Sequence, residues 1–338
     1  MKESKVMISD ANRLGLDYEA EARSLPYGEP IWDVHTHVQS VASAETMLKA
    51  MDVYGVEKVW SMSNLEITAE LKEIFGDRIE FIAVPNFSQK DEEGTFTTDW
   101  WKRIEKFAEI GTKICKFWAA PRGLDFDPMF AIDHPTRRTA MDIARDCGMM
   151  FMTHVGDPDT WFATHYKDAS KYGTKADHLA SLEKMLDEYS DVTWIAAHMA
   201  AHPEHLDILQ GVLDRHSNLY IDTSATKWMI REWSKHPKEL ADFCARNEGR
   251  VLFGSDIVTN DDNVDFDLYA SRYWALRTMW ETEYDGPSPI VDPDLTLIEP
   301  EKGKKQTAKL LGAGIPNGEL DFVYRNAAVD LLSPMYEW

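Results

Sequence analysis

Two histidines near the start of the chain have the types and spacing of a metal site. His35 and His37 follow the apolar pair Ile31 and Trp32, which predicts that both lie on a buried β-strand. Side chains two residues apart leave a strand from the same face, so both imidazoles are expected to reach one ion. Imidazole is a good ligand for Zn, Mn or Fe. Asp33 shares that face one step deeper, and we expect it to orient one of the imidazoles.

Three more polar residues close apolar runs of strand character. His154, His198 and Asp256 are the last residues of such runs. A polar side chain in this position needs a reason to be buried, and a metal supplies one. A single histidine of this kind is commonly structural, but the joint occurrence on several strands favours a common site.

These residues can meet only if their strands bring the C-terminal ends together. Short β-rich apolar runs alternate with longer segments of helical period, a pattern typical of βα units and a parallel sheet. Eight runs at this rhythm predict an α/β fold, a (β/α)8 TIM barrel, whose catalytic face is built from the strand ends. A doubly wound open sheet is the alternative. The runs are Ile31–His37, Lys58–Met62, Ile79–Pro85, Thr112–Trp118, Met149–His154, Thr193–His198, Leu219–Thr223 and Arg250–Asp256.

One large domain accounts for most of the 338 residues. Residues 1–30 are predicted to be an N-terminal extension, and residues 31–338 to form the barrel domain. The stretch 284–316 is rich in Pro, Gly, Asp and Lys and predicts an insertion. A lid, a dimer contact and a mobile loop all remain open for it. Glu319–Leu332 then predicts a final amphipathic helix.

The charge balance limits the partners. The chain has 36 basic and 58 acidic residues, a formal net charge of -22, which repels phosphate backbones and anionic lipids. We therefore expect no nucleic acid and no membrane partner. A small anionic substrate stays compatible, because a local Lys or Arg dominates inside a cleft. Three scattered cysteines, no signal-peptide core and no run of about 18 apolar residues favour a soluble cytoplasmic protein.

Taken together, the motifs resemble the amidohydrolase superfamily over most of residues 31–333. The likeness rests on Asp33-Val34-His35-Thr36-His37, His154, His198 and Phe253-Gly254-Ser255-Asp256. Three further segments resemble one branch, which includes aminocarboxymuconate semialdehyde decarboxylase, resorcylate-type decarboxylases and pyrone dicarboxylate lactonase. These segments are Ala197-His198-Met199, Asn218-Leu219-Tyr220-Ile221-Asp222-Thr223-Ser224 and Arg325-Asn326-Ala327-Ala328.

The resemblance implies a role for each strand-end residue. His35, His37 and His154 would be metal ligands, and Asp256 would be a ligand or accept the proton of a water activated by the metal. His198 would polarise the substrate or activate that water. A divalent ion lowers the pKa of its water toward about 7, and a neighbouring carboxylate can accept the proton. We expect Zn²⁺, with Mn²⁺ as the alternative, and the resemblance implies a homodimer.

The fourth predicted strand supplies candidates for substrate binding. Lys116 stands where some superfamily members have a carboxylated lysine between two metals, although a cation facing the substrate or a structural role is favoured here. Trp118 stands where relatives often have a histidine, which leaves recognition by this strand open. Arg122 would bind a substrate carboxylate or be a solvated loop residue. An aromatic group after the fifth strand would wall the site or simply pack: Trp161, Phe162, His165 and Tyr166.

Two reactions fit these residues, and the ligands do not separate them. We expect first the hydrolysis of a small cyclic ester or amide-like substrate by metal-activated water, with the carbonyl polarised by the ion and His198. The alternative is nonoxidative decarboxylation of a small unsaturated or aromatic acid, with Asp256 or His198 delivering the proton. A catalytically dead barrel is disfavoured because all five polar strand-end residues are retained. No dinucleotide fingerprint, P-loop or Gly-x-Ser-x-Gly elbow occurs.

Overall fold

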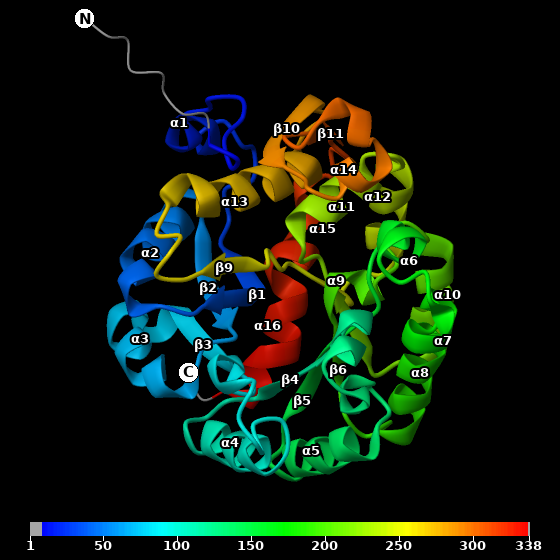
Figure 1. The fold of residues 1–338 in the computed structure, drawn as a ribbon. Helices are drawn as coiled ribbons and strands as arrows, with labels where there is room; N and C mark the ends of the chain where they lie inside the picture. The colour runs from blue at the N-terminus through cyan, green and yellow to red at the C-terminus, as the bar shows by residue number, and fades with distance from the viewer. Residues whose placement is uncertain (1–8, 337–338) are drawn as a thin grey trace, which may run out of the picture.

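A ring of parallel strands forms the centre of the computed structural model, which describes residues 9–336 (Figure 1). The sheet order is β8-β7-β6-β5-β4-β3-β2-β1-β9, and every neighbouring pair is parallel. The predicted TIM barrel is confirmed. The strands are β1 (Ile31–Val38), β2 (Val56–Ser61), β3 (Ile79–Ala83), β4 (Ile114–Ala119), β5 (Met150–Val155), β6 (Trp194–Ala196), β7 (Leu219–Asp222), β8 (Val251–Leu252) and β9 (Ile257–Thr259).

The eighth barrel strand is split, which corrects the continuous strand predicted over Arg250–Asp256. Its first piece, β8, pairs with β7, and its second piece, β9, pairs with β1. Between the two pieces the backbone N–H of Asp256 donates to the carbonyl of His35 at 2.9 Å. One segment thus pairs with both β7 and β1 and closes the ring. The interruption falls at Asp256, whose φ of 57° is incompatible with a regular strand.

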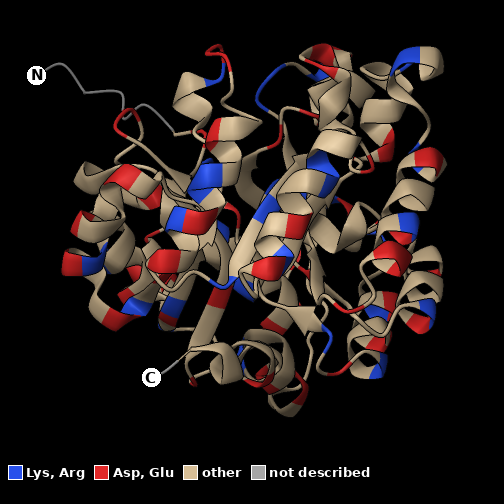
Figure 2. Ribbon diagram, turned by 90° about the horizontal axis from the view of Figure 1, so that it is seen from below, with Lys and Arg blue, Asp and Glu red and all other residues tan. Residues whose placement is uncertain are grey.

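Helices between the strands cover the outside of the ring. His134 shows how one begins, because its side chain accepts the N–H of Thr136 while Pro135 occupies the first helical position. The main helices are α2 (Ala44–Val53), α3 (Thr68–Phe75), α4 (Thr98–Glu109), α5 (Pro135–Asp146), α8 (Lys175–Glu188), α10 (Leu206–Arg215), α12 (Pro237–Arg246) and α13 (Phe266–Glu281). Acidic and basic residues are both scattered over this outer layer (Figure 2).

The last helix differs from the single one predicted over Glu319–Leu332. It consists of α15 (Asn317–Asp321), a π-helical turn (Phe322–Asn326) and α16 (Ala327–Leu332). The backbone carbonyl of Val323 accepts the N–H of Phe253 at 2.9 Å, so this segment lies against the eighth strand. A carbonyl that bonds outside its helix is compatible with the wider turn seen here.

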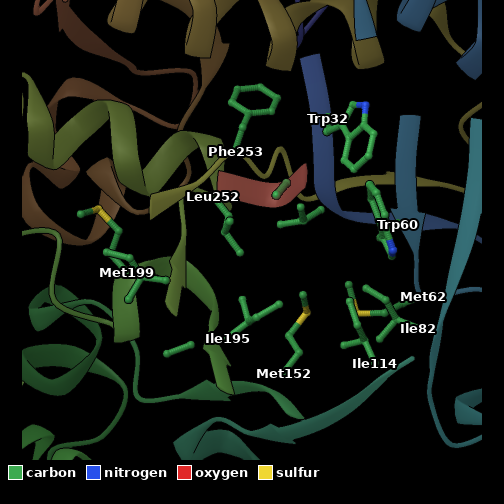
Figure 3. Packing of buried hydrophobic residues seen from close by; sticks show 14 of the residues in the cluster. Trp32, Trp60, Met62, Ile82, Ile114, Met152, Ile195, Met199, Leu252 and Phe253 are labelled. Carbon is green, nitrogen blue, oxygen red and sulfur yellow. The ribbon is translucent and has the colours of Figure 1, made fainter. Parts of the chain in front are cut away.

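Apolar side chains from all around the ring fill the barrel interior. Trp32, Ile82, Ile114, Met152 and Ile195 converge there from five different strands (Figure 3). Each is at most 6% exposed. Full burial of such a side chain contributes about 1.5–3 kcal/mol, so this layer holds the strand ends in a fixed arrangement.

Two segments outside the ring, the N-terminal residues before β1 and a hairpin within the predicted insertion, pack together on one side of it. The antiparallel hairpin β10 (Asp285–Val291) and β11 (Thr307–Leu311) lies near α1 (Tyr18–Ala22) and α13, at the top of Figure 1. The N–H of Val291 donates to the carbonyl of Asp10 at 2.8 Å, which joins the two segments directly. Among the described residues, no helix combines the length and apolar character needed to cross a lipid bilayer.

Candidate active site

One carboxylate lies against both histidines of β1. The Nε2 atoms of His35 and His37 are 3.5 and 3.1 Å from Oδ1 of Asp256. The three ligand atoms lie within 4.8 Å of one another. Burial alone would raise the pKa of Asp256, but its hydrogen bond with His37 and the nearby His35 ring hold that pKa well below its ordinary value. The carboxylate is therefore ionised, the form that binds a cation.

Two backbone features bring Asp256 to this place. A Cβ at Gly254 would lie only 2.9 Å from Cβ of His35, so the close approach of the eighth strand to β1 requires glycine. Asp256 itself has the left-handed φ of 57° noted above. This conformation costs of the order of 1 kcal/mol and is typical of functional sites, where surrounding contacts hold it.

The carboxylate that orients His35 is Asp222, at the end of β7. Its Oδ2 lies 2.7 Å from Nδ1 of His35, and its Oδ1 accepts the backbone N–H of His198 at 3.0 Å. Because Nδ1 of His35 donates to Asp222, its Nε2 keeps the lone pair that a metal takes. The sequence analysis gave Asp222 no role. A carboxylate that closes a buried strand was the signal that would have found it.

Asp33 does not orient an imidazole, contrary to the expectation from its position on β1. Its carboxylate accepts the backbone N–H groups of His35 and Ser255 at 3.1 and 3.0 Å, and the hydroxyl groups of Ser255 and Tyr273 at 2.5 and 3.1 Å. These four hydrogen bonds occupy the oxygens of Asp33, so its carboxylate does not bond to an imidazole ring. Burial raises the pKa of Asp33 to about 7. Its observed role is to tie β1 to the eighth strand.

His198 lies in a left-handed turn, not at the end of the sixth strand as predicted. β6 ends at Ala196, and the four residues from His198 to Ala201 have φ values of 51–62°. The turn places Nδ1 of His198 2.8 Å from Oγ of Ser224 and its ring 4.4 Å from that of His154. Burial, and then the neighbouring His154, lower the pKa of His198 well below its ordinary value, so its imidazole is neutral.

His154, at the end of β5, lies beside this cluster. Its Nε2 lies 3.0 Å from Oδ1 of Asp157, whose other oxygen accepts the hydroxyl of Tyr166 at 2.7 Å. The nitrogen left for a metal is therefore Nδ1. Of the four predicted ligands, the structure brings three within 4.8 Å of one another and places His154 next to them through His198.

Lys116, on β4, lines the same cavity as His35, His37 and Asp256. Its ammonium is buried and has no hydrogen-bond partner within the described part of the chain. Burial lowers the pKa of Lys116 to about 8. An unpartnered buried cation is costly, which indicates that an anionic group or ligand completes its surroundings.

A large cavity opens above these residues on the side of β1–β4, and we call it the aromatic cavity. Its volume is about 920 Å³, and it is lined by all eight predicted site residues: His35, His37, Lys116, Trp118, Arg122, His154, His198 and Asp256. Phe130 contacts Phe96 and Trp118 with ring centroids 4.9 and 5.5 Å apart. Arg122 is exposed at the mouth. The sequence analysis missed Phe96, which lies in a turn, and Phe130, which ends the short 3-10 helix Pro128–Phe130; neither segment is long enough to show a period.

A second cavity adjoins the first on the side of β5–β9, and we call it the polar cavity. Its volume is about 430 Å³, and it shares His154, His198 and Asp256 with the aromatic cavity. Trp161 lines it, whereas Tyr166 acts only through Asp157. Phe162 contacts Tyr166, with ring centroids 5.3 Å apart. The three shared residues are the point where both cavities meet.

The donor set fits a divalent metal. His35, His37 and Asp256 offer two imidazole nitrogens and an ionised carboxylate at mutual distances that one ion can bridge. Asp222 fixes the orientation of His35 in the way that carboxylates do behind metal-binding histidines. A second triplet, His35, His198 and Asp222, is equally compact, but Asp222 already accepts hydrogen bonds on both oxygens.

The fold and the site define an enzyme built on a (β/α)8 barrel. Residues 63–295, more than half of the chain, match the family model described as amidohydrolase, so the chain belongs to the amidohydrolase family. This confirms the resemblance seen in the sequence motifs. The matched range begins after β1 and therefore does not include His35 and His37.

Solved structures share the fold at low sequence identity. An uncharacterized TIM-barrel protein from Bordetella bronchiseptica has a TM-score of 0.52 and 13% identity over 90% of this chain and 99% of that one. The 5-carboxyvanillate decarboxylase from Sphingomonas paucimobilis has a TM-score of 0.45 and 11% identity, covering 88% and 99%. The 5-carboxyvanillate decarboxylase from Novosphingobium aromaticivorans, complexed with manganese and 4-hydroxy-3-methoxy-5-nitrobenzoic acid, has 0.42 and 12%, covering 74% and 91%. The two decarboxylases are too distant to bear on the reaction of this chain. No protein of curated function matches it.

Proposed function

We propose that the chain is a metal-dependent enzyme that removes carbon dioxide nonoxidatively from a small unsaturated or aromatic acid. The observation that carries the proposal is the junction of His35, His37 and Asp256 with a cavity walled by aromatic rings. A planar unsaturated body packs well against such rings, which favour edge and offset contacts.

The metal would be held by His35, His37, Asp256 and Nδ1 of His154. A divalent ion there supplies positive charge that stabilises negative charge developing on the substrate. Zn²⁺ and Mn²⁺ both suit nitrogen and carboxylate ligands, and we propose Zn²⁺ with Mn²⁺ as the alternative.

Side chains of the aromatic cavity would hold the substrate. Trp118 lies beside Phe130 and faces the cavity, so it would contact the apolar body of the acid. Lys116 and Arg122 supply positive charge at the floor and at the mouth of the cavity. These charges favour an anionic substrate despite the net charge of -22.

Proton delivery completes the reaction. When the bond between the carboxyl carbon and its neighbour breaks, carbon dioxide leaves and the neighbouring carbon keeps the electron pair. That carbon then takes one proton. His198 and Asp256 line the cavity, and they are the groups at which this proton would be held and moved.

Hydrolysis of a small cyclic ester or amide-like substrate is the second candidate. It is favoured by the ionised carboxylate of Asp256 beside two histidines, because such a group accepts a proton from an attacking water. The neutral ring of His198 would then polarise the carbonyl.

Product analysis separates the two reactions. The purified protein would be incubated in water labelled with oxygen-18, with a panel of unsaturated acids, aromatic acids and lactones. The proposal expects carbon dioxide release with no label in the remaining product. Label incorporation without carbon dioxide release would overturn it in favour of hydrolysis.

A further inference from the structure

The polar cavity contains two cations that form no ion pair within residues 9–336, although carboxylates lie near both of them. Lys227, on α11 (Thr226–Trp233), and Arg272, on α13, both line it and are half-buried. Within the described part of the chain, the Arg272 guanidinium makes one hydrogen bond, to Oγ of Ser271 at 2.8 Å, and the Lys227 ammonium makes none.

The two cations also lie close enough to repel each other. Burial and then Arg272 act to lower the pKa of Lys227, and the more weakly acting carboxylates of Asp292, Asp294 and Asp256 act to raise it. Burial lowers the pKa of Arg272 to about 10. Holding two like charges together in a half-buried place is unfavourable unless an anion joins them.

The carboxylates of the same cavity are already engaged. Asp157 binds His154, Asp256 binds His37, and Asp292 and Asp294 both bind Arg231. The chain has 58 acidic residues for 36 basic ones, so counter-charges are abundant elsewhere. Two other buried arginines have carboxylate partners, Arg103 with Glu66 and Arg277 with Glu281, whereas buried Arg137 donates to backbone carbonyls. The lack of an ion pair at Lys227 and Arg272 therefore does not result from a shortage of carboxylates in the chain.

We propose that Lys227 and Arg272 form a subsite for an anionic oxygen group, carboxylate or phosphate, next to the metal centre. An ion in this position accepts charge-assisted hydrogen bonds from both cations. Because the cavity shares His154, His198 and Asp256 with the aromatic cavity, a bound molecule can place its anionic group here while its apolar body contacts the aromatic rings. The inference rests on the proposed function for the identity of the neighbouring centre.

Binding of inorganic phosphate tests the subsite. Isothermal titration calorimetry on the metal-loaded protein should detect binding, and Arg272→Met and Lys227→Met should each weaken it about 10- to 100-fold. Arg272→Lys keeps the charge and should stay within about threefold of the unchanged protein. Lys90→Met is the matched control, because Lys90 is an exposed cation of the aromatic cavity, and it should leave the affinity unchanged.

Absence of phosphate binding, or equal affinity in Arg272→Met, Lys227→Met and the unchanged protein, would overturn the subsite. Benzoate as a second probe identifies the source of the anionic group. A carboxylate attached to a ring should lose affinity in Trp118→Ala as well as in Arg272→Met, whereas a free anion should lose it in Arg272→Met alone. Metal content measured on the same samples separates this inference from the proposed function. Normal metal with no subsite refutes only the inference, and a subsite without metal refutes only the proposed function.

Discussion

The two cavities that meet at His198 are built by opposite halves of the barrel and differ in character. The aromatic cavity is formed by the ends of β1–β4 and is walled by packed rings around Phe130. The polar cavity is formed by the ends of β5–β9 and is lined by charged groups, with Arg231 binding Asp292 and Asp294 behind it. The proposed metal ligands lie on the boundary between the halves.

This difference indicates that the two cavities have separate roles in binding a substrate around one proposed metal site. Aromatic surface selects a substrate by shape and apolar contact, whereas charged groups fix the position of an anionic group. The two walls are also stabilised differently. Packing holds the aromatic wall, and a buried ion network holds the rear of the polar cavity. Substitutions should therefore lower stability for different reasons: through lost packing in the aromatic wall, and through lost ion pairs behind the polar cavity.

Arg231→Met should have the largest effect on stability. Arg231 is 4% exposed and binds Asp292 and Glu232, and the change leaves buried Asp292 without a cation and Glu232 with only the exposed Lys235. We expect a loss of about 3–5 kcal/mol in the free energy of unfolding, measured by urea titration. Arg246→Met removes an exposed pair with Asp214 and should cost less than about 1 kcal/mol. Equal losses in the two variants would show that the network does not hold the wall.

Phe130→Ala removes a ring from the aromatic wall and should lower the free energy of unfolding by about 3 kcal/mol. Its ring is 3% exposed, and the guanidinium of Arg137 lies 4.9 Å from its centroid. The loss combines the transfer of the ring with the void left behind. Phe126→Ala is the control in the same urea titration, because Phe126 is 58% exposed and its removal should change stability by less than about 0.5 kcal/mol. If the two losses were alike, packing would not be what holds the wall.

Lys116→Met should increase stability in a pH-dependent way in the metal-free protein. Burial lowers the pKa of Lys116 from 10.5 to about 8, so the folded state disfavours the charged form. At pH 7 this cost is about 3 kcal/mol, and it disappears as the pH rises from about 8 through about 10.5. The variant should therefore be more stable at pH 7, with a difference that shrinks above pH 8.

Urea titrations at several pH values measure this difference, and Lys90→Met, at an exposed site, should show none. A gain in Lys116→Met that does not depend on pH would contradict the assignment of a charged lysine to the floor of the aromatic cavity.

Asp222→Asn should have a smaller effect, on metal affinity. The amide keeps the shape of the side chain but weakens its hold on Nδ1 of His35. Loss of such an orienting carboxylate typically weakens metal binding about 10- to 100-fold. Competition with a chelator measures the change, and Asp262→Asn, at an exposed position near the same end of the barrel, should leave it unaltered. Unchanged affinity in Asp222→Asn would mean that His35 is not a ligand.

The strand pattern could be predicted from the sequence because burial on both faces produces apolar runs that end in polar residues. Seven barrel strands and the first piece of the eighth occur where these runs predict them. What the pattern could not reveal is backbone conformation at the strand ends. The left-handed turn at His198 and the positive φ of Asp256 are imposed by tertiary contacts and leave no mark in the periodicity.

The site residues also differ in whether the sequence alone could identify them. His35, His37 and Asp256 could be nominated from type and position, and the structure places them together. Asp33 was expected to orient an imidazole, but Asp222 orients His35 instead, because the choice of carboxylate depends on neighbouring strands and not on spacing along β1. Phe96 and Phe130 lie between the main elements, and Lys227 and Arg272 lie on two separate helices, α11 and α13, so spacing along the chain does not show that they line the cavities.

Metal content is the most direct test of the central claim. The protein would be purified without added metal or chelator and measured by elemental mass spectrometry, beside His35→Ala. The account predicts about one equivalent of a divalent transition metal in the unchanged protein and less than about a tenth of an equivalent in the variant. Equal metal content in the two proteins, or no metal in the unchanged protein even after metal is supplied, would contradict it.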